Sequence, residues 1–261
     1  VRKLLSFTTP KAPITESCEG WVQTARNMTE TDANTTVVQA TGLGKRFGKQ
    51  WALAHCDLEV RQGQSVLLAG ANGSGKTTLL RLIAGLYKPT QGELRIFGHD
   101  PQHERLTCRE TLTMVGHDHY LYSQLTAPET VRVWARLGGI ELSADRLAEL
   151  LDEVDLDNSI KQPVGGFSAG MKKRMTLLRT RLERPRLVLL DAPFSALDTR
   201  GQKLVEDWVH AYKAAGKTVV VASHNLPRAA ELCDRAIYLQ QGQIIWQGAS
   251  TDMVQQLGLA S

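Results

Sequence analysis

The sequence contains few cysteines, and their spacing excludes the commonest cysteine-based sites. Its four cysteines are Cys18, Cys56, Cys108 and Cys233, and no two of them form a CxxC pair. This spacing matches no zinc-ligand pattern, so a metal site built on these thiols is not expected. Free thiols in a reducing compartment are the simpler interpretation.

Long hydrophobic runs and a strong excess of charge are absent as well. Of the 261 residues, 42% are hydrophobic, yet no apolar run approaches the ~20 residues that a membrane-spanning helix needs. A membrane, if one is involved, must be spanned by a partner. The formal net charge is only +4, and the basic residues are spread along the chain, so nucleic acid is not an expected partner.

The first 34 residues lack the hydrophobic periodicity of an ordered element. They are rich in Ser and Thr, and no apolar stretch follows the basic start "VRKLLSF", which argues against a secretory signal. Glu16, Glu19, Glu30 and Asp32 argue against a transit peptide. We interpret residues 1–34 as a disordered extension. The alternative is a gene start assigned too far upstream.

Beyond residue 35, strand-like and helical patterns alternate, which predicts an α/β fold with right-handed crossovers. Continuous apolar runs end at Ala69, Leu190 and Ala222, as expected for strands covered on both faces. The segment "RAIYLQQGQIIWQG" predicts a hairpin that turns at Gln241-Gly242.

The middle of the chain has a helical period instead. Thr126 and Glu129 have the spacing of a capping box, and Pro128 fits the first turn of a helix. The segment "SADRLAELLDEV" places its leucines on one helical face. We therefore predict a helical subdomain over about residues 116–172.

A glycine-rich loop follows the first buried strand. The stretch Gly70–Thr77, "GANGSGKT", fits the pattern GxxxxGK[ST] and lies between a strand and a helix, which is the context that this motif requires. Backbone amides would surround phosphates, Lys76 would neutralise the β and γ oxygens, and the Thr77 hydroxyl would bind magnesium. The predicted ATP-binding residues of the loop are Gly70, Asn72, Gly73, Ser74, Gly75, Lys76, Thr77 and Thr78.

Asp191 ends another apolar strand, "LVLL", at the sheet edge where α/β proteins bind their ligands. A carboxylate there predicts a second contact to the magnesium of MgATP. ATP and Mg²⁺ are therefore the expected ligands.

At "FSAGMKKR" the sequence resembles the ATP-binding cassette superfamily, the nucleotide-binding subunits of ABC transporters. Ser168, Ala169, Gly170 and Met171 occupy the positions of the family signature Ser-Gly-Gly-Gln. A serine hydroxyl and free amides at a helix N-terminus form an anion site. The resemblance implies that this site covers the γ-phosphate of ATP held by a second cassette.

Other positions that match the family follow in order over about residues 37–247. The resemblance implies that Phe47 stacks on adenine, that Ser195–Asp198 form the loop crossing the dimer interface, and that His224 contacts the γ-phosphate. It also implies an ABC ATPase domain over residues 35–250, followed by a C-terminal tail over residues 251–261. The implied fold is a P-loop NTPase with a RecA-like core and mainly parallel sheet, an N-terminal antiparallel β subdomain and a helical insert.

The run "VGHDHYLYSQLTAPETVRVWARLGG" is similar to the heme-exporter ATPase of the cytochrome c maturation system. His117 stands where most cassettes carry a glutamine that senses magnesium. The resemblance implies heme-related export, a homodimer with membrane-spanning subunits as partners, and a peripheral location at the cytoplasmic face of the inner membrane.

One residue departs from the family pattern. Ala192 follows Asp191, where the family carries the glutamate that activates the attacking water. Loss of a general base typically costs about 100- to 10,000-fold in rate. Three explanations stay open: a native alanine beside a competent partner, replacement of the base by Asp198, His224 or His117, or a substitution introduced to trap the ATP-bound dimer.

Three functions follow from these observations. The first is the ATPase subunit of an exporter, and the second is an ATP-gated binding switch with little catalysis, which only Ala192 favours. The third is a cassette of DNA repair or translation. Such proteins carry long coiled-coil insertions or tandem cassettes, which 261 residues do not accommodate.

Overall fold

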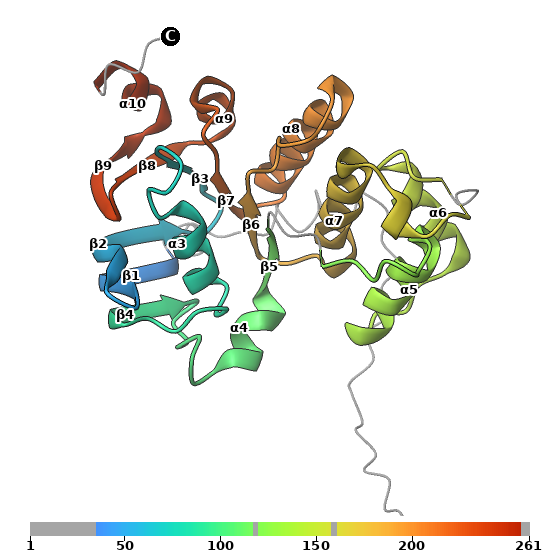
Figure 1. Ribbon diagram of the computed structural model, residues 1–261, viewed down its shortest axis with the longest axis horizontal. Helices are drawn as coiled ribbons and strands as arrows, with labels where there is room; N and C mark the ends of the chain where they lie inside the picture. Colours follow the sequence, from blue (N-terminus) through green and yellow to red (C-terminus); the bar gives the residue numbers. More distant parts are fainter. Residues whose placement is uncertain (1–34, 117–119, 158–160, 257–261) are drawn as a thin grey trace, which may run out of the picture.

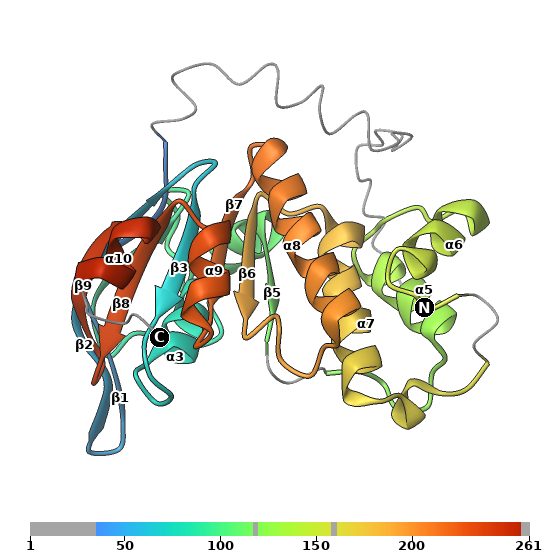
Figure 2. The same ribbon diagram turned by 90° about the horizontal axis from the view of Figure 1, so that it is seen from above.

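The computed structural model describes residues 35–116, 120–157 and 161–256 of the protein. The extension predicted for residues 1–34 therefore lies outside the described residues. Figure 1 shows two sheets and helix α3 (Lys76–Ile83) at one end of the molecule. Helices α5 (Ala127–Leu137) and α6 (Ala144–Asp152) lie at the other end, with α7 (Ala169–Glu183) and α8 (Thr199–Ala214) between them. The same arrangement is seen from above in Figure 2.

The central sheet has six strands in the order β5-β6-β7-β3-β8-β9. The first five run parallel, and β9 pairs with β8 in the antiparallel direction. The mainly parallel sheet predicted from the sequence is thus confirmed. The strands are β3 (Ser65–Ala69), β5 (Leu112–Val115), β6 (Leu187–Asp191), β7 (Thr218–Ala222), β8 (Arg235–Gln240) and β9 (Gln243–Ala249).

A second, three-stranded sheet is antiparallel and has the order β2-β1-β4. Its strands are β1 (Thr36–Phe47), β2 (Gln50–Arg61) and β4 (Gln91–Ile96). The alternating pattern of "GELRIFG" predicts an edge strand, and β4 does form an edge of this sheet. Strands β1 and β2 are longer than their apolar segments because both continue into the turn at Gly48-Lys49.

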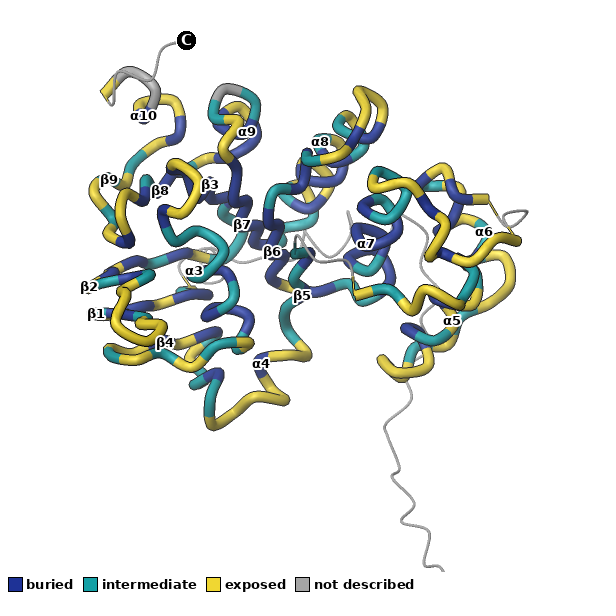
Figure 3. The backbone as a smooth tube through the Cα atoms, viewed as in Figure 1, coloured by how far each residue is buried: buried dark blue, intermediate teal, exposed yellow. Residues whose placement is uncertain are grey.

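The central sheet lies between two hydrophobic cores. Alternate residues of β6 point to opposite faces: Leu187 and Leu189 belong to the core with α3 and the antiparallel sheet, whereas Val188 and Leu190 belong to the core with α5, α6, α7 and α8. All four are at most 2% exposed. Figure 3 shows the central strands as buried along their length. This is why their sequences are continuous apolar runs rather than alternating ones.

The helices that flank the sheet bury apolar side chains. The helix predicted after the glycine-rich loop is α3 (Lys76–Ile83), and α7 (Ala169–Glu183) begins directly after Ser168, as expected. On α7, Met175, Leu178 and Leu182 are buried. Helix α8 (Thr199–Ala214) buries Val205, Trp208 and Tyr212.

The helical subdomain contains α5 (Ala127–Leu137), α6 (Ala144–Asp152) and a short 3₁₀ turn, η1 (Val164–Gly166). The capping box predicted for α5 is present. Glu129 Oε2 accepts a bond from the Thr126 amide at 2.8 Å, and the Thr126 hydroxyl accepts one from the Glu129 amide at 3.4 Å. Each side chain thus satisfies a backbone donor that the helix leaves unpaired.

Thr126→Ala is expected to lower the free energy of unfolding by about 1 kcal/mol, because it removes the N-cap acceptor of α5. Urea unfolding followed by circular dichroism measures this loss. Thr107→Ala, an exposed threonine inside a helix, is the matched control and should change stability by no more than a few tenths of that value. Equal effects of the two substitutions would contradict a capping role.

Four short elements are not indicated by the sequence pattern. They are α4 (Arg105–Thr111), β5, α9 (Leu226–Leu232) and α10 (Ser250–Gln256). Helix α10 occupies the described part of the C-terminal segment, and its Met253 is fully buried. Among the residues that the structure describes, no helix is both long and apolar enough to cross a membrane.

Candidate functional site

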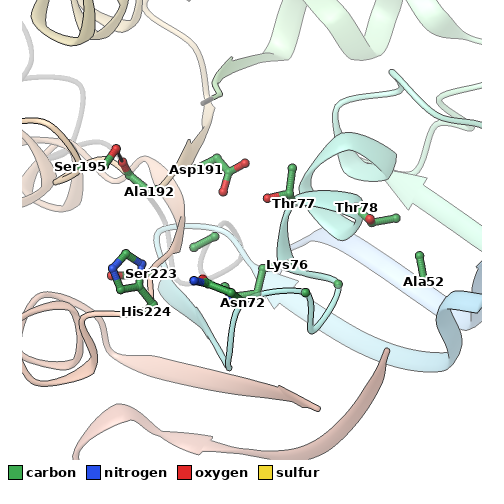
Figure 4. Close-up of a pocket in the computed structure, with 13 residues that line it drawn as sticks. Ala52, Asn72, Lys76, Thr77, Thr78, Asp191, Ala192, Ser195, Ser223 and His224 are labelled. Carbon is green, nitrogen blue, oxygen red and sulfur yellow. Dashed lines mark hydrogen bonds between the residues drawn. The ribbon is translucent and has the colours of Figure 1, made fainter. Parts of the chain in front are cut away.

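Three neighbouring strands deliver their carboxyl ends to one cavity. In the order β6-β7-β3 the strands are parallel, so the loops that follow Asp191, Ala222 and Ala69 emerge at the same sheet edge. The cavity has a volume of about 410 Å³, and Figure 4 shows residues from all three loops around it. Its lining consists of Ala52, Asn72, Gly73, Gly75, Lys76, Thr77, Thr78, Asp191, Ala192, Ser195, Ala222, Ser223 and His224.

Two glycines are required by the loop over Gly70–Thr77. Gly70 has φ 141°, and a Cβ atom there would lie 2.2 Å from the carbonyl oxygen of Leu239. Gly75 has φ 109°, and its Cβ would lie 2.7 Å from the carbonyl oxygen of Ala52. Only glycine fits such a conformation against neighbouring backbone. The loop can therefore curve with its amides close to a ligand.

Lys76 lies inside this curve. Its Nζ donates to the carbonyl oxygens of Gly70 and Ala71, both at 2.8 Å, and contacts Ser74 Oγ at 3.4 Å. Partial burial lowers the pKa of Lys76, while the charge of Asp191 opposes that shift. The ammonium group is thus held at the centre of the loop, where an anion would meet it.

The turn of the β8–β9 hairpin is hydrogen-bonded to the glycine-rich loop. Gly242, in the predicted turn, donates its amide to Ser74 O at 3.1 Å and accepts from the Ala54 amide at 2.8 Å. Gln241 and Gly242 have φ 49° and 78°, as a tight turn of this kind requires. Strand β2, the hairpin and the glycine-rich loop are therefore connected by backbone hydrogen bonds.

Asp191 faces the loop from the end of β6. The residue is 5% exposed, and its Oδ2 is buried without a hydrogen-bond partner in the described structure. Figure 4 shows the Asp191 carboxylate and the Thr77 hydroxyl directed into the same space. A buried carboxylate oxygen without a partner is costly unless a cation or donor binds it. These two oxygen ligands fit Mg²⁺, which prefers carboxylate and hydroxyl oxygens.

Ala192 also lines the cavity, and it leaves the site without a second carboxylate. Among the described residues of the lining, Asp191 is the only carboxylic acid. Ala192 has φ 45° and donates its amide to Ala222 O at 2.9 Å, so the turn after β6 is fixed by backbone contacts. Ser195 donates its hydroxyl to Ala192 O at 2.8 Å, which occupies that hydroxyl within the loop.

The residues considered as replacement bases lie in different places. His224 lines the cavity and is exposed. Asp198 is not part of the lining; its Oδ1 accepts the Gly201 amide at 2.8 Å and caps α8. His117 lies outside the described residues. His224 is therefore the one described candidate that the structure places at the cavity.

Phe47 ends β1 and is not part of the cavity lining. Its side chain is 47% exposed and packs edge-on against Tyr87, with ring centroids 5.4 Å apart. Lys45 Nζ lies 5.1 Å from the centroid of the Phe47 ring. The Phe47 ring is therefore half-exposed, and its stacking on adenine stays a prediction.

The signature residues do not line the cavity. Ser168 caps α7 by accepting the Met171 amide at 3.2 Å, and both Ser168 and Ala169 are exposed. Helix α7 lies on the other side of β5 and β6 from α3 (Figures 1 and 2). A Cβ atom on Gly170 would lie 2.9 Å from Ala196 O, so the helix start packs against the loop after β6. Within one chain the two predicted phosphate sites are thus separate.

Sequence reasoning did not single out Ala52, Ala222 or Ser223 as part of the site. Alanine has no functional group that would mark it in a sequence, and small side chains contribute to the site by leaving space in the cavity. Ser223 is buried, and its hydroxyl accepts the Asn225 amide at 3.0 Å, which shapes the turn that carries His224. Only its position directly before His224 could have indicated it.

A glycine-rich loop around a lysine, facing a buried carboxylate at the end of a neighbouring strand, defines a P-loop nucleotide-binding protein. The model of the "ABC transporter" family matches residues 53–195, more than half of the chain. The chain belongs to the ABC transporter family, as an ATP-binding subunit.

Curated relatives agree with this assignment. The chain is 32% identical over 211 residues to a bacitracin transport ATP-binding protein of Bacillus licheniformis, which covers 80% of this chain and 69% of that protein. It is 31% identical over 225 residues to a daunorubicin resistance ATP-binding protein of Streptomyces coeruleorubidus, covering 85% and 71%, respectively.

Solved structures share the fold. The ATP-binding subunit of an ABC transporter superposes with a TM-score of 0.77 at 29% identity, covering 86% of this chain and 94% of that one. A dimeric, post-hydrolysis cassette, MJ0796, bound to ADP and phosphate gives 0.74 at 27% identity, covering 82% and 98%. The predicted ABC ATPase fold is confirmed.

Proposed function

We propose that this chain is the ATP-binding subunit of a membrane exporter, in which two copies close over MgATP. The observation that carries the proposal is the meeting of Lys76, Thr77 and the unpaired Asp191 oxygen at one cavity, with the exposed Ser168 outside its lining. Such a site holds one face of a nucleotide, and the separate anion site on α7 suits the nucleotide of another copy.

The residues have distinct roles in this proposal. The amides of Gly70–Thr77 and the Lys76 ammonium bind the phosphates, while Asp191 and Thr77 hold magnesium, which neutralises the charge that develops on the phosphates. Phe47 stacks on the adenine. His224 donates to the γ-phosphate and orients it, and Ser168 with the amides of Ala169 and Gly170 covers it from the second copy. ATP binding then favours the closed dimer, and loss of the γ-phosphate favours the open one.

The membrane subunits would select the cargo, so the substrate is a separate question. The similarity of residues 115–139 to heme exporters supports heme as the cargo. The names of the bacitracin and daunorubicin relatives support another small-molecule exporter. Transport of heme into inverted vesicles that contain the chain and its membrane subunits tests the choice. In either case the chain would lie peripherally at the cytoplasmic face of the inner membrane.

Ala192 supports a second function. Because the described lining offers no second carboxylate beside Asp191 to activate water, the cassette could act as an ATP-gated switch beside a partner cassette that hydrolyses. The two functions differ in one measurable quantity, the steady-state ATPase rate of the purified chain.

Light scattering in the presence of MgATP is expected to give twice the mass found with MgADP, because only the γ-phosphate links the two copies. Slow hydrolysis should make this dimer long-lived. Ser168→Glu places a negative charge next to the covered phosphate and should keep the protein monomeric, while each copy still binds MgATP.

Ser143→Glu is the matched control. Ser143 also caps a helix, since its hydroxyl accepts the Arg146 amide at 3.1 Å, but α6 belongs to the helical subdomain and is not part of the signature. This variant should dimerise like the wild type. A monomer at saturating MgATP in the unmodified chain would overturn the proposed closed dimer.

A further inference from the structure

Lys173 is a buried lysine that the proposed mechanism does not use. It lies in the second turn of α7, five residues after Ser168, and is 1% exposed. Its neighbour Lys172 is only half-buried and donates to Gly165 O at 3.1 Å. The two adjacent lysines therefore have different environments, and only Lys173 points into the protein.

The Lys173 ammonium group joins the ends of two strands. Its Nζ donates to Asp191 O at 3.1 Å and to Gly116 O at 3.3 Å. Strands β5 and β6 are neighbours, and Val115 lies opposite Leu190. Gly116 and Asp191 each come one residue later, so their carbonyl groups lie at the same edge of the sheet. One side chain thus connects helix α7, the strand that carries Asp191, and the loop that leads to the helical subdomain.

Burial of the Lys173 side chain is energetically unfavourable. Burying an ammonium group carries a large desolvation penalty, and hydrogen bonds to two carbonyl groups offset only part of it. Burial, opposed by the charge of Asp191, lowers the pKa of Lys173 to about 8. In the described structure no carboxylate forms an ion pair with Lys173. A neutral side chain of similar length would fill the same space with a smaller desolvation penalty.

We propose that Lys173 is a positioning residue that fixes the backbone of Asp191 so that its carboxylate meets the magnesium of MgATP. The inference depends on the proposed function, because it assigns Asp191 as a magnesium ligand. A hydrogen bond to the backbone oxygen of Asp191 restricts rotation of that peptide unit. Through Gly116 and α7, the same contact connects the nucleotide site to the helical subdomain.

The test compares ATP binding with and without magnesium in the full chain, using a fluorescent ATP analogue. Lys173→Met keeps the length of the side chain but removes the charge and the donors. It should weaken binding of the magnesium complex by about 10-fold, as is typical for residues that orient a metal ligand. Binding in EDTA, which depends on the glycine-rich loop, should change less than 2-fold.

Two further variants complete the design. Lys172→Met is the same substitution one position earlier and should bind like the wild type under both conditions. Lys173→Gln keeps an amide donor and is expected to fall between the wild type and Lys173→Met. It also provides the measurement if Lys173→Met does not fold.

The outcomes separate the inference from the proposed function. Equal losses with magnesium and with EDTA, or no loss in either Lys173 variant, would overturn the positioning role. If instead the unmodified chain does not bind MgATP, the proposed function itself fails.

Discussion

Ala192→Glu is expected to raise the steady-state ATPase rate by about 100- to 10,000-fold, because it restores a general base at the cavity. Ala192 lines the cavity directly after Asp191, the proposed magnesium ligand. Its φ of 45° is equally accessible to glutamate and alanine, so the change adds no backbone strain. Phosphate release at saturating MgATP measures the effect.

Ala192→Gln is the control for this experiment. Glutamine has nearly the size of glutamate but does not accept a proton, so its rate should stay close to that of the unmodified chain. An unmodified chain that already turns over at about 10 s⁻¹, a typical enzymatic rate, would contradict the expectation. If His224→Ala abolished such a rate, His224 would be the replacement base.

Lys76→Ala is expected to weaken MgATP binding by about 30-fold or more. Removing one partner from a hydrogen-bonded charge pair costs about 2–5 kcal/mol, and about 1.4 kcal/mol corresponds to a factor of ten. Lys76 Nζ already lies within 2.8 Å of two loop carbonyls, so the charge is positioned before the nucleotide arrives. Calorimetric titration with MgATP measures the loss.

The matched variant is Lys203→Ala, which removes an exposed lysine of α8 that pairs with Asp207 at 3.0 Å. It should leave MgATP affinity unchanged, because an exposed i,i+4 pair contributes little. If Lys76→Ala bound MgATP as tightly as Lys203→Ala, the glycine-rich loop would not be the phosphate site.

The parts of the fold that could be predicted are those with a local physical cause. The capping box of Thr126 and Glu129 fixes where α5 begins, and Gln241-Gly242 fixes the hairpin turn. Buried strands such as β6 are visible because both of their faces are covered. Each of these signals lies within a few residues of the structure that it produces.

The elements that could not be predicted depend on distant contacts. Strand β5 has four residues and follows α4 without a turn, and the residues that it pairs with in β6 lie 75 positions further along the chain. Helix α10 is polar apart from residues such as Met253, which is buried only because β8, β9 and α9 are nearby. No local pattern contains this information.

The candidate site also contains residues that the sequence identifies and residues that it does not. The residues Gly70–Thr77 form one continuous motif, and Asp191 marks a strand end, so both could be identified from the sequence. Lys173 could not, because "MKKR" does not reveal which of two adjacent lysines enters the interior. That choice depends on the rotation of α7 against β5 and β6.

The two backbone hydrogen bonds of Gly242 limit where the chain can be modified. Because this glycine bonds to both Ser74 and Ala54, and its Cβ would lie 2.8 Å from Ala52 O, the turn has no space for extra atoms or residues. A tag, fluorophore or new chain terminus placed there would distort nucleotide capture from about 170 positions downstream. Circular permutants and biosensors of this cassette should therefore be opened elsewhere, at surface turns such as Gly139, where a Cβ atom meets nothing within 4 Å.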